Sequence, residues 1–89
     1  MRYEFRWNRW NIDYIAAHGV APDQAEYVVE HARRPYPTKE ADRFMVKGQT
    51  TEGQWLQVAY VFDPPGVVYV IHARPLTDRE KRQTRRRHR

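Results

Sequence analysis

The chain has 89 residues, no cysteine and a formal net charge of +5. A chain this short forms one small domain with a thin core, and its lack of cysteine excludes disulfides and thiolate zinc sites. Extra stability could come from self-association or from a partner protein. No apolar run approaches the roughly 20 residues that span a bilayer, and residues 1–10 are too charged and aromatic for a signal peptide. We therefore expect a cytoplasmic protein with no membrane partner.

The positive charge is concentrated at the end of the chain. Residues 74–89 carry eight of the sixteen lysines and arginines but two of the eleven acidic residues. A segment of this kind suits RNA, DNA or an acidic protein surface. For residues 85–89 alone, a solvated and frayed tail is an equally good interpretation.

The N-terminal part of the chain predicts a strand followed by a helix. Apolar and charged residues alternate over residues 3–7, as in a short half-buried strand. The next apolar residues have the spacing of one helix face over residues 11–17. Asn8 or Asn11 can cap this helix, and Gly19 can end it.

A second helix is predicted over residues 22–34. Pro22 suits its first turn, where the missing N–H costs nothing. Apolar residues then recur every three or four positions, which indicates packing against a sheet. Residues 35–37, Pro-Tyr-Pro, end the helix. We predict a loop over residues 38–41.

Three strands are predicted after this loop, over residues 42–48, 54–62 and 67–73. In the first, Phe44 and Val46 lie on one face, with Arg43, Met45 and Lys47 on the other; in the second, the residues at 56, 58, 60 and 62 form one apolar face. The polar turn 49–53 and the turn 63–66, Asp-Pro-Pro-Gly, are short enough to join them as an antiparallel meander.

The last strand is predicted to lead directly into a basic helix. Residues 67–71 are the clearest strand signal and should form the centre of the sheet. Pro75 then ends the strand. Thr77 and Glu80 form a Thr-x-x-Glu capping box, which starts a helix. After Leu76 this helix contains no large apolar residue, so the sequence predicts no face with which it docks on its own core.

Together these elements predict an α+β domain. Its small antiparallel sheet consists of a three-stranded meander plus the short N-terminal strand, with two helices before the meander and one basic C-terminal helix. We expect residues 1–84 to form this single domain and residues 85–89 to form a basic tail.

Four short motifs are spread over nearly the whole chain. They are Trp7-Asn8-x-x-Asn11, His18-Gly19-Val20-x-Pro22, Arg43-x-x-x-x-Gly48-x-Thr50 and Val70-Ile71-x-Ala73-Arg74-x-x-Thr77-x-x-Glu80. In order and approximate spacing, from Trp7 to about Arg82, this set resembles the BrnT family of type II toxins. No single motif is specific; the combination is fairly specific.

The resemblance implies a compact α+β fold similar to RelE-type ribonucleases, and a toxin that cleaves RNA without a metal or a cofactor. It also implies a small antitoxin with a ribbon-helix-helix DNA-binding part, which wraps the toxin in a hetero-oligomer and represses the shared operon. The chain departs from the family at Thr84, where members often have an aromatic residue, usually Tyr. Such a residue in RelE-like toxins can stack on a base or act in proton transfer.

Metal-free RNA cleavage needs a base for the 2′-hydroxyl proton, cations for the phosphate charge and an acid for the leaving 5′-oxygen. Arg43 and Lys47 share one face of their predicted strand, because their separation is even. His72 and Arg74 share one face of the last strand for the same reason. If both faces point the same way, these four candidate catalytic side chains converge. Glu80 could act as a base or hold an arginine in place.

Further candidates for RNA binding lie on the basic helix, where arginines suit the phosphate backbone. They are Arg79, Arg82, Arg85 and Arg86. The histidines lack tight metal-ligand spacing, so we predict no metal site.

Each candidate residue also has a structural interpretation. Arg74 could simply pair with Glu80, whose presence the capping box already explains. Arg43 and Lys47 could form the solvated face of an edge strand. His18 also suits a structural role, because a histidine in the last turn of a helix interacts favourably with the helix dipole.

Two functions follow from these observations, and a third is weaker. The first is a ribonuclease toxin that is inhibited by an antitoxin. The second is a non-enzymatic basic module, an inactive toxin relative that binds RNA or an acidic protein. The third, a DNA-binding regulator, lacks the expected pair of helices with a basic recognition face, since residues 11–34 are acidic overall.

Overall fold

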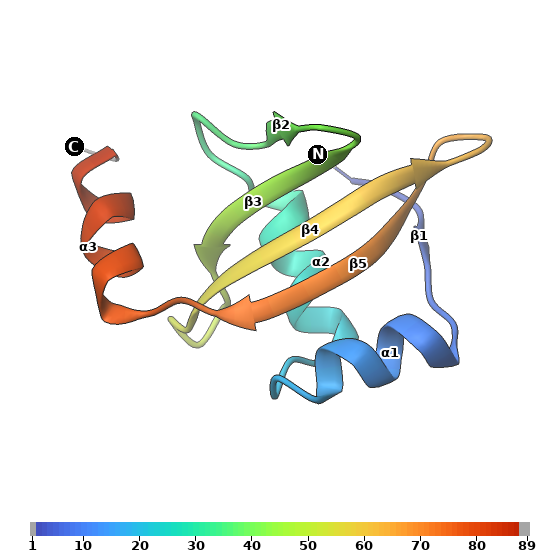
Figure 1. Ribbon diagram of the computed structural model, residues 1–89, viewed down its shortest axis with the longest axis horizontal. Coiled ribbons are helices and arrows are strands. Elements are labelled where there is room, and N and C mark those ends of the chain that lie inside the picture. Colours follow the sequence, from blue (N-terminus) through green and yellow to red (C-terminus); the bar gives the residue numbers. More distant parts are fainter. Residues whose placement is uncertain (1, 88–89) are drawn as a thin grey trace.

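The protein is an α+β domain with a five-stranded mixed sheet and three helices, seen in a computed structural model that describes residues 2–87 (Figure 1). The strands are β1 (Phe5–Arg6), β2 (Thr38–Glu40), β3 (Arg43–Gln49), β4 (Trp55–Asp63) and β5 (Val67–Pro75). The helices are α1 (Arg9–Ala16), α2 (Pro22–Glu30) and α3 (Asp78–Arg87). No helix within residues 2–87 is long and apolar enough to cross a membrane.

The predicted α+β class and the meander are confirmed. The strand order is β1-β5-β4-β3-β2, in which β3, β4 and β5 are consecutive antiparallel neighbours. The predicted start and end of β3 and β4 are correct to within one residue. Alternation of apolar and polar residues predicts such half-buried strands well, because one face of each packs against the core.

The predicted loop over residues 38–41 is wrong, because β2 pairs antiparallel with β3 there. Its sequence, Thr-Lys-Glu, has no apolar alternation. An edge strand needs none, and charged residues on an edge discourage pairing with another chain. The turn between β2 and β3 uses Ala41 with a positive φ of 58°, which a sequence pattern does not predict for alanine.

The N-terminal strand is shorter than predicted and changes the type of the sheet. β1 forms only two pairs, Phe5 with Val68 and Arg6 with Tyr69, and it runs parallel to β5. The prediction of an all-antiparallel sheet is therefore wrong. β5 lies between β4 and β1, so the centre of the sheet is β4 rather than residues 67–71.

Three predicted boundaries also differ, the first being the start of α1 at Arg9 instead of residue 11, directly after its cap Asn8. α2 ends at Glu30 and not at residue 34, because the backbone of His31 leaves helical geometry, with φ −110° and ψ 27°, and its ring nitrogen Nδ1 lies 2.9 Å from the carbonyl oxygen of Tyr27. β5 runs to Pro75 instead of residue 73. The N–H of Leu76 donates to the carbonyl of Trp55, so the neighbouring nitrogen of Pro75 points away from β4 and its missing hydrogen breaks no bond of the ladder.

The core lies between α2 and one face of the sheet, with α1 beside β5 (Figure 1). α2 contributes three buried residues, Ala25, Val28 and Val29, and α1 contributes Ile15. On the sheet, the buried side chains include Val46, Leu56, Val58, Tyr60, Val68, Val70 and Ala73. The opposite face of β3, β4 and β5 is left uncovered by α2.

A β-bulge in β5 decides which side chains reach this uncovered face. Ala59 pairs with His72, and the next residue, Tyr60, pairs with Val70, so Ile71 is the extra residue. Val70 faces the core before the bulge, and Ala73 faces it afterwards. The bulge therefore turns His72 and Arg74 to the face opposite the core. Bulges often re-aim a side chain in this way next to functional sites.

Candidate functional site

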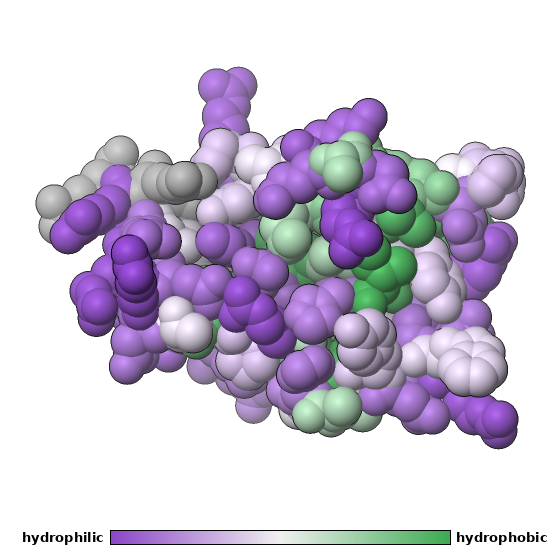
Figure 2. Space-filling view, in the orientation of Figure 1, coloured by the Kyte–Doolittle hydropathy of each residue, from purple (hydrophilic) through white to green (hydrophobic). Residues whose placement is uncertain are grey.

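The uncovered face of β3, β4 and β5, which we call the open face, brings the predicted site residues together. Two rows cross its three strands: Met45, Ala59 and His72 in one, and Lys47, Gln57 and Arg74 in the other. Arg43 lies on the same face as Met45, two residues earlier in β3. In Figure 2, which has the orientation of Figure 1, hydrophilic residues cover α3 and the adjoining part of this face.

Arg74 and Glu80 form the tightest polar contact of the open face. Both guanidinium Nη atoms donate to the Glu80 carboxylate, each at 2.8 Å. Nη1 also donates to the carbonyl of Pro75 at 3.1 Å, and Nη2 donates to the side-chain oxygen of Gln57 at 3.4 Å. The guanidinium is therefore held in one orientation at the end of β5.

The predicted capping box at the start of α3 is present. The N–H of Thr77 donates to Oε1 of Glu80 at 2.9 Å, and the N–H of Glu80 donates to the hydroxyl of Thr77 at 3.2 Å. Glu80 thus joins the helix to Arg74 and satisfies a helix end with the same carboxylate. This contact links the rigid sheet to the basic helix.

The ionisation of this pair favours one of the two predicted roles of Glu80. The hydrogen bonds from Arg74, followed by those from Thr77, lower the pKa of Glu80 to about 2, and the hydrogen bond to Glu80 raises the pKa of Arg74. A carboxylate with so low a pKa is a weak proton acceptor at neutral pH. The geometry therefore favours Glu80 as the residue that orients Arg74.

This pairing predicts an effect on acid stability. The pKa of Glu80 is about 2 in the folded chain, against an ordinary value of 4.5. A lowered folded-state pKa stabilises the fold above pH 4.5, and this contribution is lost as the pH falls from about 4.5 towards 2. Glu80→Gln should remove this part of the pH dependence in urea unfolding measured between pH 2 and 7. The exposed Glu52→Gln is the control, and an unchanged profile in Glu80→Gln would refute the prediction.

His72 lies in a small cluster of rings between β5 and α1. Its ring centroid is 5.2 Å from that of His18 and 5.6 Å from that of Tyr14. Partial burial, and then the positive charges of His18, Arg74 and Arg43, lower the pKa of His72 below 6.5. At neutral pH its imidazole is therefore uncharged and able to accept a proton.

Sequence reasoning missed Tyr14 and interpreted His18 as structural. Both side chains are exposed; Tyr14 lies in α1, and His18 follows two residues after its last residue, Ala16. That spacing was a usable signal, because an exposed aromatic and a histidine at i and i+4 form one surface. The contact with His72 itself joins segments more than fifty residues apart, which no local pattern predicts.

Arg43 and Lys47 supply positive charge with little neutralisation. Arg43 is about half exposed, and its contact with Asp42 is long, at 3.8 Å. Lys47 is partly buried and forms no ion pair within residues 2–87. These two cations are available to an anion on the open face.

The basic helix α3 presents arginines on one side and a buried side on the other. Arg79, Arg82 and Arg86 line a pocket of about 290 Å³. Arg85 is also exposed. Thr84, on the other side, is 1% exposed, but no described residue of α3 belongs to the hydrophobic core cluster, in agreement with the lack of an apolar face.

Thr84 is the position at which the sequence resemblance leads one to expect an aromatic residue. Its hydroxyl donates to the carbonyl of Glu80 at 2.9 Å. Because this side chain is buried and its hydroxyl is used within the helix, it is not placed to stack on a base. The chain therefore lacks an aromatic contact from this position.

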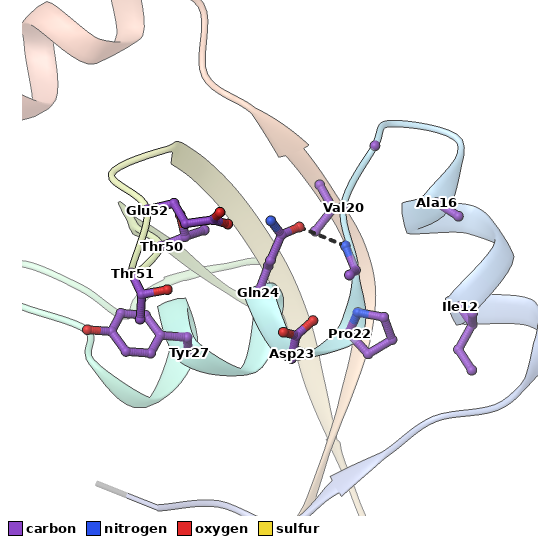
Figure 3. A pocket seen from close by; sticks show the side chains of 12 residues that line it. Ile12, Ala16, Val20, Pro22, Asp23, Gln24, Tyr27, Thr50, Thr51 and Glu52 are labelled. Carbon is purple, nitrogen blue, oxygen red and sulfur yellow. Dashed lines mark hydrogen bonds between the residues drawn. The ribbon is translucent and has the colours of Figure 1, made fainter.

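A larger pocket, of about 730 Å³, lies between α1, α2 and the turn after β3 (Figure 3). Asp23 and Glu52 line it, together with apolar residues such as Ile12 and Val20, and no lysine or arginine is among its described lining residues. An acidic pocket repels RNA, and it shares no residue with the open face. We therefore do not assign it to the candidate site.

Within residues 2–87, no three side chains of His, Asp or Glu lie together in a way that could hold a metal ion. Comparison of the chain with protein-family models, curated proteins and solved structures gave no match. The motifs of the sequence and the geometry of the open face are therefore the indications of function that the chain offers.

Proposed function

We propose that the protein is a metal-free endoribonuclease toxin of a type II toxin–antitoxin system, acts in the cytoplasm and is inhibited by a ribbon-helix-helix antitoxin. The observation that carries the proposal is the grouping of His72 with Arg43, Lys47 and Arg74 on one uncovered sheet face. An uncharged imidazole among cations supplies two of the components that RNA cleavage without a metal requires, the base and the cations. The motif resemblance to BrnT toxins supports the same class.

In the proposed mechanism, His72 removes the proton from the 2′-hydroxyl, and the 2′-oxygen attacks the adjacent phosphorus. Arg43, Lys47 and the oriented guanidinium of Arg74 stabilise the negative charge that develops on the phosphate. The P–O5′ bond breaks, a water molecule gives a proton to the 5′-oxygen and regains one from protonated His72, and the products are a 2′,3′-cyclic phosphate and a 5′-hydroxyl. The arginines Arg79, Arg82, Arg85 and Arg86 of α3 bind the phosphates of neighbouring nucleotides.

A second candidate is a non-enzymatic module that binds RNA or an acidic protein. Two observations favour it. Arg74 is occupied by Glu80, and the position that often carries an aromatic residue in BrnT proteins is the buried Thr84. Such a module would bind through the same basic surface without breaking a bond.

Induced expression in a bacterial host separates the two candidates. A ribonuclease toxin should stop growth and shorten total RNA, and co-expression of an antitoxin encoded beside it should restore growth. The purified chain should cleave single-stranded RNA in the presence of EDTA and leave 2′,3′-cyclic phosphate ends. Unchanged growth and intact RNA, with RNA binding retained, would instead establish the non-enzymatic module.

A further inference from the structure

A second pocket, of about 490 Å³, lies at the end of β3 beside the open face. Its volume falls within the roughly 300–1,000 Å³ that is usual for small-ligand sites. It is lined by Tyr27, His31, Ala32, Arg33, Lys47, Gly48, Gln49, Thr50 and Trp55. These residues come from α2 and the segment after it, from β3 and its turn, and from the first residue of β4.

The lining of this pocket is aromatic and cationic. The rings of Tyr27 and His31 are stacked, with centroids 4.0 Å apart and planes 20° apart. The indole of Trp55 and the basic side chains of Arg33 and Lys47 complete the wall, and no acid is among the described lining residues. Flat rings beside positive charge suit the bases and phosphates of a single-stranded nucleic acid. The acidic pocket beside α1 lacks these properties.

The pocket adjoins the predicted site through two residues. Lys47 belongs both to the pocket and to the row that contains Gln57 and Arg74. Trp55 pairs with Gln49 and lies on the open-face side of β4, since the next residue, Leu56, faces the core. A nucleotide in the pocket therefore lies next to a phosphate held on the open face.

The backbone leaves this place accessible. β2 pairs with β3 only from Arg43 to Met45, so no strand flanks Lys47, Gly48 and Gln49 on that side. α2 packs close to β3 here, since a Cβ at Gly48 would lie in van der Waals contact with Cγ1 of Val28, at 3.4 Å. The uncovered strand edge and the rings of α2 together form the pocket.

We propose that this pocket binds the base of a nucleotide that flanks the scissile phosphate of single-stranded RNA. The inference rests on the proposed function for its substrate, but base binding can be measured without cleavage. Trp55 provides a stacking surface, and Lys47 holds the adjoining phosphate. Tyr27 and His31 form the opposite aromatic wall.

The test uses hexanucleotides in which hydrogen replaces every 2′-hydroxyl, so that they cannot be cleaved. A series is prepared in which each member lacks one base, and binding is measured by fluorescence anisotropy. With the parent chain, removal of one particular base should weaken binding by on the order of tenfold, which is typical of a lost base–aromatic stack. In Trp55→Ala, removal of the same base should not weaken binding further. In Trp55→Phe, removal of that base should still cause most of the loss of binding seen with the parent chain.

Trp10→Ala is the matched control, because this tryptophan is 78% exposed and lies outside the pocket. If Trp55→Ala does not fold, Tyr27→Leu, which keeps an apolar side chain of similar length, serves as the second variant. Base-dependent binding without RNA cleavage would support the pocket and refute the ribonuclease. If the chain cleaves RNA and the pocket variants still lose as much binding on base removal as the parent chain, base binding in this pocket is refuted and the ribonuclease proposal stands.

Discussion

Replacing His72 by alanine is expected to lower the rate of RNA cleavage by about 10²- to 10⁴-fold, the usual contribution of a general base. His72 is the one imidazole that the bulge in β5 turns onto the open face, in the same row as Met45 and Ala59. Single-turnover cleavage of a short RNA by the purified variants measures the loss. Tyr69→Phe is the control and should leave the rate unchanged, because it removes only an exposed hydroxyl three residues before His72 in β5.

The pH profile distinguishes a catalytic base from a structural histidine. Burial and the cations His18, Arg74 and Arg43 lower the pKa of His72 below 6.5. The cleavage rate should therefore rise with pH up to this lowered pKa and then reach a plateau, and His72→Ala should lose that dependence. His18→Ala should move the rise to higher pH, because it removes one of the charges that lower the pKa. A full rate in folded His72→Ala would assign the base to another residue.

Local patterns predicted most of the elements, and they predicted which neighbours on a strand share a face. The even separation of Arg43 and Lys47 places them together in β3, which has no bulge. The Thr77–Glu80 capping box also formed as expected, because a helix start is decided by a few adjacent residues. Such features depend on contacts close in sequence.

The open face could not be predicted from the same patterns. If β5 ran through Ile71 without the bulge, regular alternation would place His72 and Arg74 on the core side with Val70. The sequence has no glycine at this point to indicate a bulge. The convergence of the four side chains was therefore a conditional prediction, and strand register decides it.

The contacts between distant segments were missed for a related reason. β2 pairs with β3 without any apolar alternation, and α1 brings Tyr14 and His18 to His72 across the chain. The pocket of about 490 Å³ at the end of β3 likewise depends on where β2 stops pairing, which leaves that end of β3 uncovered. Tertiary packing decides these arrangements. The local sequence of either contacting segment gives little indication that the other segment lies beside it.

Replacing Arg74 by alanine is expected to lower the rate of RNA cleavage about a hundredfold, which corresponds to roughly 3 kcal/mol of transition-state stabilisation. Arg74→Lys should restore little, because lysine keeps the charge but cannot form the bidentate fork that the carboxylate of Glu80 holds in place. Arg43→Ala should have a similar but smaller effect, since its side chain is more exposed. Rates are measured on variants whose urea unfolding shows them to be folded.

Glu80→Gln separates the two roles that Arg74 can have. If the only role of Arg74 is to link β5 to α3 through Glu80, Arg74→Ala and Glu80→Gln should lower the stability by similar amounts and the activity by similar amounts. If Arg74 contacts the phosphate, Glu80→Gln should leave a large part of the activity, because the guanidinium remains on the open face and is no longer neutralised by a carboxylate. Arg74→Ala should then be the far slower enzyme at comparable stability. A folded Arg74→Ala with full activity would remove Arg74 from the site and leave Arg43 and Lys47 as its cations.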